Sequence, residues 1–259
     1  MIDSHCHLNL PPLCDDIPHV LATAKQNGLK RLMVPGITPE SWSTLRYYQN
    51  TYSDILPIDI AIGLHPYFLL QNEQSLSESL ALLEKTIDSN VRAIGETGLD
   101  GHISVCMKMQ KQSLHAHLNL AEAQGLPVIL HHRKSHHLLL EALKSSVFSG
   151  SGVIHAFSGS IDVAERYIDK GFYLGIGGTI TYERAKKTRD TVAHLIRYYS
   201  DRILLETDAP DMPMSGRQGK TNMPRFITDV IDAMTALSDI EPSELINITT
   251  TNYNRLFNI

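Results

Sequence analysis

Two histidines stand one residue apart at the start of the chain, in the run Asp3-Ser4-His5-Cys6-His7. Along an extended strand alternate side chains point the same way, so we expect His5 and His7 to face one side together. Two neutral imidazoles held that close form half of a site for a divalent metal. A chance pair in a polar N-terminus would look the same. The meaning of the pair therefore depends on whether later segments bring further ligands to it.

Five later apolar runs are each followed by a side chain that can bind a metal or move a proton. They are His65 after residues 58–64, Glu96 after 91–94, His131 after 127–130, His155 after 152–154 and Asp208 after 202–205. Each of these alone has an ordinary structural explanation, such as a hydrogen-bonded histidine or a helix cap. Their repetition at the same point of successive segments indicates a shared site.

The elements that position these residues alternate along the whole chain. Strands are predicted at 1–5, 30–34, 58–64, 91–94, 127–130, 152–154, 172–176 and 202–205, and helices at 17–27, 41–51, 76–89, 107–124, 137–145, 162–170 and 183–199, with two more at 224–236 and 242–257. Such alternation predicts parallel strands joined by right-handed crossovers. A doubly wound sheet fits less well, because no glycine-rich phosphate loop follows the first strand. We expect an α/β fold, a (β/α)8 TIM barrel, with residues 1–259 as one domain.

The active-site residues of such a barrel come from the C-terminal ends of its strands. A pair of metals needs about four to six ligands, and a bridging carboxylate commonly holds the two ions ~3.5–4 Å apart. The chain supplies that inventory with His5, His7, Glu96, His131, His155 and Asp208. We therefore predict two divalent cations, and the ligand types are compatible with Zn, Mn or Mg.

Composition limits the other classes of function. The formal net charge is −5, from 28 acidic and 23 basic residues, which argues against a generally basic nucleic-acid coat. Three cysteines without a CxxC motif favour reduced thiols. The sequence has no signal-like segment and no run of about 20 apolar residues, so we expect a cytoplasmic protein without a membrane partner. No obligate protein partner is evident.

The motifs around these residues resemble the TatD-type metal-dependent hydrolases and deoxyribonucleases. The resemblance is carried by Asp-Ser-His-Cys-His-Leu at 3–8, Gly-Leu-His-Pro at 63–66, Gly-Glu-Thr-Gly-Leu-Asp at 95–100, Pro-Val-Ile-Leu-His-His-Arg at 127–133, Ile-His-Ala-Phe-Ser-Gly at 154–159 and Glu-Thr-Asp-Ala-Pro at 206–210. The run 177–182 and the run 209–213 further resemble one bacterial branch of that family. The match covers nearly the whole chain in order, and implies a TIM barrel of the metal-dependent hydrolase type.

The resemblance also implies roles for the ligands. His5, His7 and Asp208 would hold one metal, His131 and His155 the other, and Glu96 would bridge them. Members of the family cleave DNA phosphodiesters, some as 3′-to-5′ exonucleases, so the implied substrate is single-stranded or 3′-ended DNA. The sequence departs from the family at Gly101-His102-Ile103, where many relatives carry aromatic residues.

The reaction predicted for this site is metal-assisted hydrolysis of a phosphate ester, with water activated by the metals. Asp208 is the candidate general base as well as a ligand. Arg133 is expected to grip the phosphate with its planar fork, and His65 to donate to it or to support a ligand. Asp3 shares the parity of the two N-terminal histidines and is expected to orient them. Basic residues in the loops at 133–134, 184–189 and 217–220 predict a locally positive mouth.

Two other functions compete with this interpretation. An amidohydrolase or lactonase acting on a carbonyl substrate would share His-x-His, two later histidines and the strand-8 aspartate. Such enzymes usually bridge their metals with a strand-4 lysine, and this chain has Glu96 at that place. A catalytically idle metal-binding barrel that serves as an interaction platform is the other alternative. It is disfavoured because all six ligand positions are intact.

Overall fold

The predicted alternation produces eight parallel strands. A computed structural model describes residues 1–69 and 73–259, and its sheet has the order β1-β2-β3-β4-β5-β6-β7-β8. The strands are β1 Ile2–Asp3, β2 Arg31–Pro35, β3 Ile58–Ile62, β4 Val91–Asp100, β5 Val128–Arg133, β6 Gly152–Ile154, β7 Phe172–Ile176 and β8 Ile203–Leu205. The two edges of the sheet meet at an isolated parallel bridge between Cys6 and Ala209. The fold is therefore a nearly closed (β/α)8 TIM barrel, as predicted.

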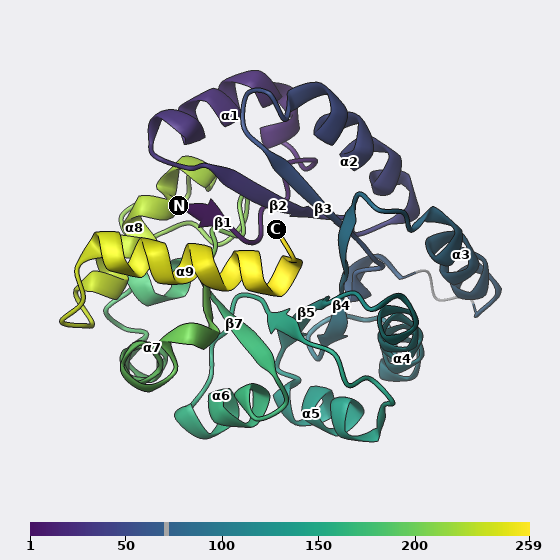
Figure 1. The fold of residues 1–259 in the computed structure, drawn as a ribbon. Coiled ribbons are helices and arrows are strands. Elements are labelled where there is room, and N and C mark those ends of the chain that lie inside the picture. The colour runs from purple at the N-terminus through teal and green to yellow at the C-terminus, as the bar shows by residue number, and fades with distance from the viewer. Residues whose placement is uncertain (70–72) are drawn as a thin grey trace.

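Helices follow the strands and form the outer layer (Figure 1). They are α1 Ile17–Gln26, α2 Pro39–Tyr52, α3 Glu73–Thr86, α4 Met107–Gln124, α5 His136–Ser145, α6 Ile161–Ile168, α7 Lys186–Tyr198, α8 Ile227–Thr235 and α9 Pro242–Phe257. The predicted bounds of α4 and α9 match, and the other predicted helix ends differ by a few residues. The predicted helix 224–236 begins as a separate 3-10 turn, η5 Pro224–Phe226. None of the helices in the described ranges is both long and apolar enough to cross a membrane.

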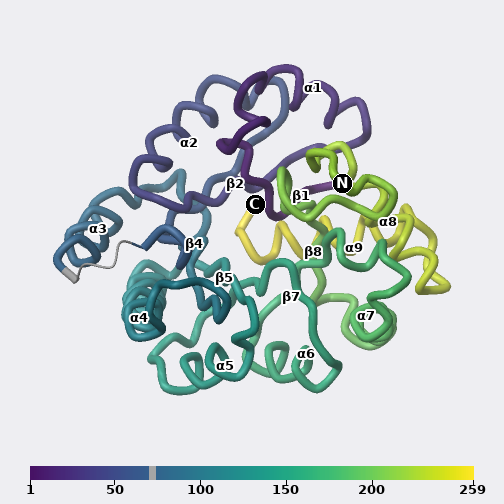
Figure 2. The backbone as a smooth tube through the Cα atoms, turned by 180° about the vertical axis from the view of Figure 1, so that it is seen from behind, coloured from purple at the N-terminus to yellow at the C-terminus, as the bar shows by residue number. Residues whose placement is uncertain are grey.

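The barrel interior is filled by one apolar side chain from each strand. This layer consists of Ile2, Met33, Ala61, Ala93, Ile129, Val153, Tyr173 and Leu204. Tyr253, Leu256 and Phe257 of α9 pack against it. Figure 1 shows α9 crossing that end of the barrel beside both chain termini, and Figure 2 shows the opposite side. The interior is thus a packed core closed at the α9 end, and the opposite end carries the strand termini where a site can form.

The first strand is shorter than predicted. It ends at Asp3 rather than His5, and Ser4 lies in a bend. Ile2 belongs to the interior layer, yet the odd-numbered His5 and His7 also reach the barrel axis, so the side-chain alternation shifts by one at this bend. The prediction that the two histidines face the same side is met, but not by an unbroken strand.

Two other strands are longer than predicted, and one of them is irregular. Strand β4 runs on to Asp100, and β5 runs on to Arg133. Between Ile94 and Thr97 the pairing of β4 with β5 shifts by one residue, which is the signature of a β-bulge. The extra residue falls at Gly95 and Glu96, immediately where the sequence predicts a ligand.

Candidate metal centre

All six predicted ligands converge at the open end of the barrel, and Glu96 lies at their centre. Its Oε2 atom is 3.1 Å from Nε2 of His5 and 3.3 Å from Nε2 of His7. Glu96 is almost completely buried, with an exposed fraction of 1%. The two N-terminal histidines therefore both lie next to the same oxygen of this carboxylate.

The second oxygen of Glu96 faces a different set of imidazoles. Its Oε1 atom is 2.8 Å from Nε2 of His155, 3.1 Å from Nδ1 of His131 and 3.2 Å from Nε2 of His65. The carboxylate thus stands between two groups of donors, one on each oxygen. This is the position that a bridging ligand occupies in a two-metal site.

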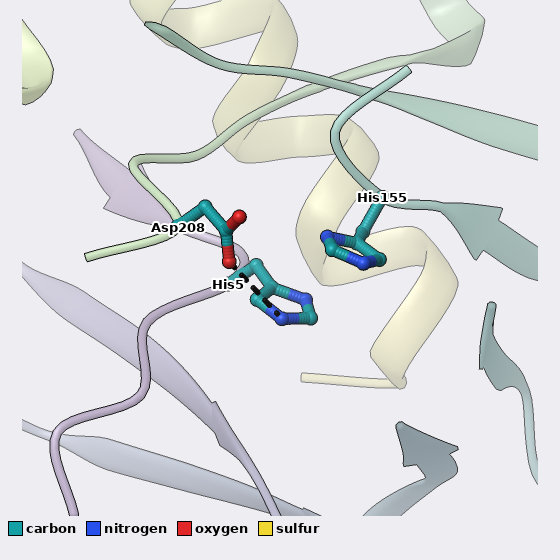
Figure 3. Close-up of side chains that lie close together, drawn as sticks. All are labelled: His5, His155 and Asp208. Carbon is teal, nitrogen blue, oxygen red and sulfur yellow. Dashed lines mark ion pairs between the residues drawn. The ribbon is translucent and has the colours of Figure 1, made fainter. Parts of the chain in front are cut away.

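Asp208 completes the first group from the other edge of the sheet. Its Oδ1 atom is 3.7 Å from Nε2 of both His5 and His7. The rings of His5 and His155 stack with their centroids 4.0 Å apart, so donor atoms of His5, His155 and Asp208 also lie within 4.8 Å of one another. Figure 3 shows Asp208 and His155 on either side of His5. The two groups of donors therefore adjoin each other.

The chemistry of this donor set fits a divalent cation. The Nε2 atoms of His5 and His7 point at each other across 3.2 Å, with a carboxylate oxygen beside both. A neutral imidazole carries one lone-pair nitrogen and one N–H, and here the lone-pair atoms can all turn inward. The Nδ1 atoms of His5, His7 and His155 are buried without a hydrogen-bond partner among the described residues. Convergent lone pairs of nitrogen and carboxylate oxygen are the ligands that such cations take.

The electrostatics of the cluster point the same way. Burial opposes ionisation of Glu96, but the imidazoles of His155, His65 and His5 outweigh it and hold the carboxyl pKa well below its ordinary value. Burial likewise opposes a charged His155, yet the carboxylates around it, Glu96 first, raise its pKa to about 10, so a cation bound by His155 would have to displace this proton. Burial lowers the pKa of His5 well below its ordinary value. The centre holds an ionised carboxylate in a buried place and so attracts positive charge.

The bulge in β4 is what aims Glu96 into the barrel. Ala93 faces the interior and Ile94 the helix layer, so regular alternation would turn residue 96 outward. The extra residue of the bulge shifts the alternation by one position, so that Glu96 faces the interior. Gly95 and Gly98 both have φ of 150°, and a Cβ atom there would lie 2.6 Å from the Ile129 carbonyl oxygen and 2.1 Å from that of His131. Glycine is needed at both places because β5 runs too close for any side chain.

Two buried carboxylates support the ligand-bearing segments. Asp3 accepts the backbone N–H of His5 at 3.2 Å and that of Thr207 at 2.9 Å, and it also accepts the Thr207 hydroxyl at 2.6 Å. The sequence suggested that Asp3 orients the two histidines. In the structure Asp3 instead holds the backbone of both segments and hydrogen-bonds to neither imidazole ring. Glu206 accepts the backbone N–H of Ala156 and, at 3.4 Å, the hydroxyl of Ser4. Burial raises the pKa of Asp3 to about 7 and that of Glu206 to about 8.

Comparison with known proteins places this chain in a family. The family model described as TatD related DNase matches residues 2–258. The chain belongs to the TatD family. The metal-dependent hydrolase YjjV of Escherichia coli K12 is 37% identical over 260 residues, covering 100% of this chain and 98% of that protein. A metal-dependent hydrolase of Haemophilus influenzae is 36% identical over 254 residues, covering 94% of each. The crystal structure of the TatD homolog YjjV superposes with a TM-score of 0.91 at 37% identity, covering 100% of this chain and 98% of that one.

In this TatD protein, Asp100 is a site residue that the sequence argument did not assign. Its Oδ2 atom lies 3.4 Å from Nε2 of His131, while Nδ1 of the same ring faces Glu96. A carboxylate behind a metal-binding histidine fixes its tautomer and orientation. The sequence did carry a signal, since Asp100 has the parity of Glu96 in the same motif.

A cavity of about 520 Å³ opens over this TatD centre. Five of the six predicted ligands line it together with His65. The other lining residues are Leu10, Ile37, Tyr67, Phe68, Asp100, Arg133, Asp211 and Met212. Among the described residues predicted to make a positive mouth, Arg133 lines the cavity. Arg217 is instead paired with Asp229, 2.6 Å from its Nε, and Arg189 donates to the carbonyl of Ile180. The positive mouth is therefore smaller than predicted.

Proposed function

We propose that this chain is a divalent-metal-dependent hydrolase of phosphate esters, most simply a deoxyribonuclease that acts on single-stranded or 3′-ended DNA. The observation that carries this proposal is the position of Glu96, whose two oxygens face two different groups of imidazoles. A carboxylate in that place suits a pair of cations gripping a phosphoryl group. Family membership and the hydrolase names of the relatives agree with it.

The ligand set divides between two cations. We assign His5, His7 and Asp208 to one cation, His131 and His155 to the other, and Glu96 to both. When bound, the cations would activate the attacking water, polarise a phosphoryl oxygen and neutralise the leaving oxygen.

The protein side chains then supply the remaining steps. Asp208 lines the cavity with 13% of its side chain exposed, so it can accept the proton of the attacking water. Arg133 stands in the cavity wall and can donate to two phosphate oxygens at once. His65 is held by Glu96 at 3.2 Å and can support the ligands or donate to the phosphate. Water adds to phosphorus and gives a proton to Asp208, the ester P–O bond breaks, and the leaving alkoxide oxygen takes up that proton or one from solvent.

The test is a substrate panel on protein of measured metal content. Single-stranded DNA, RNA of equal length and a chromogenic phosphodiester are compared with amide and lactone substrates. We expect phosphodiester cleavage that disappears on chelation and returns with added metal. Carbonyl hydrolysis without phosphodiester cleavage would refute the proposal in favour of an amidohydrolase or lactonase. A metal-loaded protein that is inactive on the whole panel would refute it in favour of an idle barrel.

The variant Glu96→Gln tests the bridging role. We expect activity to fall by more than about 100-fold, because losing a mere supporting partner of a ligand already costs 10- to 100-fold. Asp59→Asn is the matched control, since Asp59 is also a buried acid but contacts Arg31 and Tyr253. Full activity of Glu96→Gln would show that the assigned bridge is wrong.

A further inference from the structure

Two exposed aromatic rings stand at the edge of the cavity. Tyr67 is 62% exposed and Phe68 is 43% exposed, although both line the same cavity as the metal ligands. Their ring centroids are 5.0 Å apart with the planes at 76°. Aromatic side chains left in water beside a polar site need an explanation, because packing would have buried them.

These rings are fixed relative to the metal centre. They belong to the 3-10 turn η2, Pro66–Phe68, which follows the cluster residue His65. Nδ1 of His65 accepts the backbone N–H of Tyr67 at 3.1 Å, and its carbonyl accepts that of Phe68 at 3.0 Å. Pro66 and Leu69 on either side are buried, so the turn is anchored at both ends while its two aromatic rings face outward.

A continuous path leads from the ligands to these rings. Nε2 of His65 is 3.2 Å from Glu96, and the His65 ring is 5.9 Å from the Phe68 ring in an edge-on arrangement. Phe68 then contacts Tyr67 further out. A ligand with its anionic group on the metal centre would therefore place its next flat group against Phe68 and Tyr67.

We propose that Tyr67 and Phe68 form a stacking wall for the nucleobase attached to the phosphate that is cleaved, in which one ring stacks on the face of the base and the other, at 76° to it, contacts the edge of the base. This inference rests on the proposed function, and it names the residues that would hold a base of the DNA substrate. Aromatic rings stack on every base, so such a wall gives affinity with little sequence preference.

The experiment is a cycle that removes the ring and the base separately. Two oligonucleotides are compared as substrates of the metal-loaded protein, one complete and one with an abasic sugar at the cleaved end. For Tyr67→Ala and Phe68→Leu we expect kcat/KM on the complete strand to fall about tenfold, mainly through KM. On the abasic strand, wild type and variants should agree within about twofold. Tyr67→Phe, which keeps the ring, should behave as wild type.

The matched control is Tyr198→Ala, which removes an equally exposed ring, 59%, from the outer helix α7. This variant should leave kcat/KM on both strands unchanged. An equal loss on both strands, or no loss on either, would overturn the stacking wall. Cleavage of neither strand by the wild type would instead refute the proposed function. Fluorescence of a terminal 2-aminopurine then decides the stacking alone: quenching by wild type but not by Tyr67→Ala supports the wall, and equal quenching overturns it.

Discussion

Because Asp100 contacts His131, a substitution at Asp100 should weaken the binding of one metal without affecting the other. Asp100→Asn keeps the shape of the side chain, and its Oδ1 can still accept the backbone N–H of His102, now at 2.7 Å. At Oδ2, however, an NH2 group replaces the acceptor that faces Nε2 of His131. A hydrogen bond to a charged group contributes about 1.5–3 kcal/mol, and the length of 3.4 Å places this one at the lower end. A loss of about 1.5 kcal/mol corresponds to a roughly tenfold higher dissociation constant for the metal.

The assay is competition with a chromogenic chelator, which resolves the occupancy of each class of site. We expect the dissociation constant to rise about tenfold for the cation that we assign to His131 and His155, and to stay unchanged for the one assigned to His5, His7 and Asp208. Wild-type protein measured in parallel supplies the reference. Equal weakening of both classes, or no change in either, would refute the view that Asp100 acts through His131.

Two further predictions concern stability near the site. His117 is fully buried and accepts the backbone N–H of Leu64 at 3.0 Å, and burial lowers its pKa to about 4. The unfolded chain binds a proton at this histidine below pH about 6.5, so the free energy of unfolding falls by about 3 kcal/mol as the pH falls from 6.5 to 4. Urea titrations at several pH values should show a smaller dependence of stability on pH in His117→Gln than in wild type. An equal dependence in both proteins would contradict the prediction. In Gly175→Ala the new Cβ would lie 2.1 Å from Oε2 of Glu206, displacing a buried carboxylate from its donors and costing about 2 kcal/mol or more in the free energy of unfolding. Gly177→Ala, whose Cβ would meet Glu206 only at 3.4 Å, is its control, and equal stability of the two variants would show that the crowding is relieved elsewhere.

The barrel was predictable because local patterns determine it. Apolar runs alternate with amphipathic stretches over the whole chain, and that alternation allows few topologies. For example, α4 ends at the predicted residue 124, and Gly125 follows it in the left-handed conformation. The candidate ligands could be found for the same reason, since parallel strands bring their C-terminal ends to one place. Their role as metal ligands stays a prediction.

Details of the centre could not be predicted because they depend on contacts between strands. The bulge that turns Glu96 inward arises from the close approach of β4 and β5, and strand periodicity alone would have turned residue 96 outward. The bend at Ser4 similarly resets the alternation before His5. Tyr67 and Phe68 follow a histidine that the sequence did single out, but their exposure could be known only once the turn was placed.

The seam of the barrel links its chemistry to the order in which the chain is made. Strands β1 and β8 meet through bonds of the ligand-bearing segments: the Asp208 N–H donates to the His5 carbonyl at 2.9 Å, and the His7 N–H donates to the Ala209 carbonyl at 2.7 Å. His5 and His7 leave the ribosome first, whereas Asp208 follows some two hundred residues later. The proposed ligands of the first cation are therefore incomplete on a nascent chain, and a cation bound to all three would link the first and last strands of the barrel. On that assignment, metal binding would add to the stability of the contact between the first and last strands.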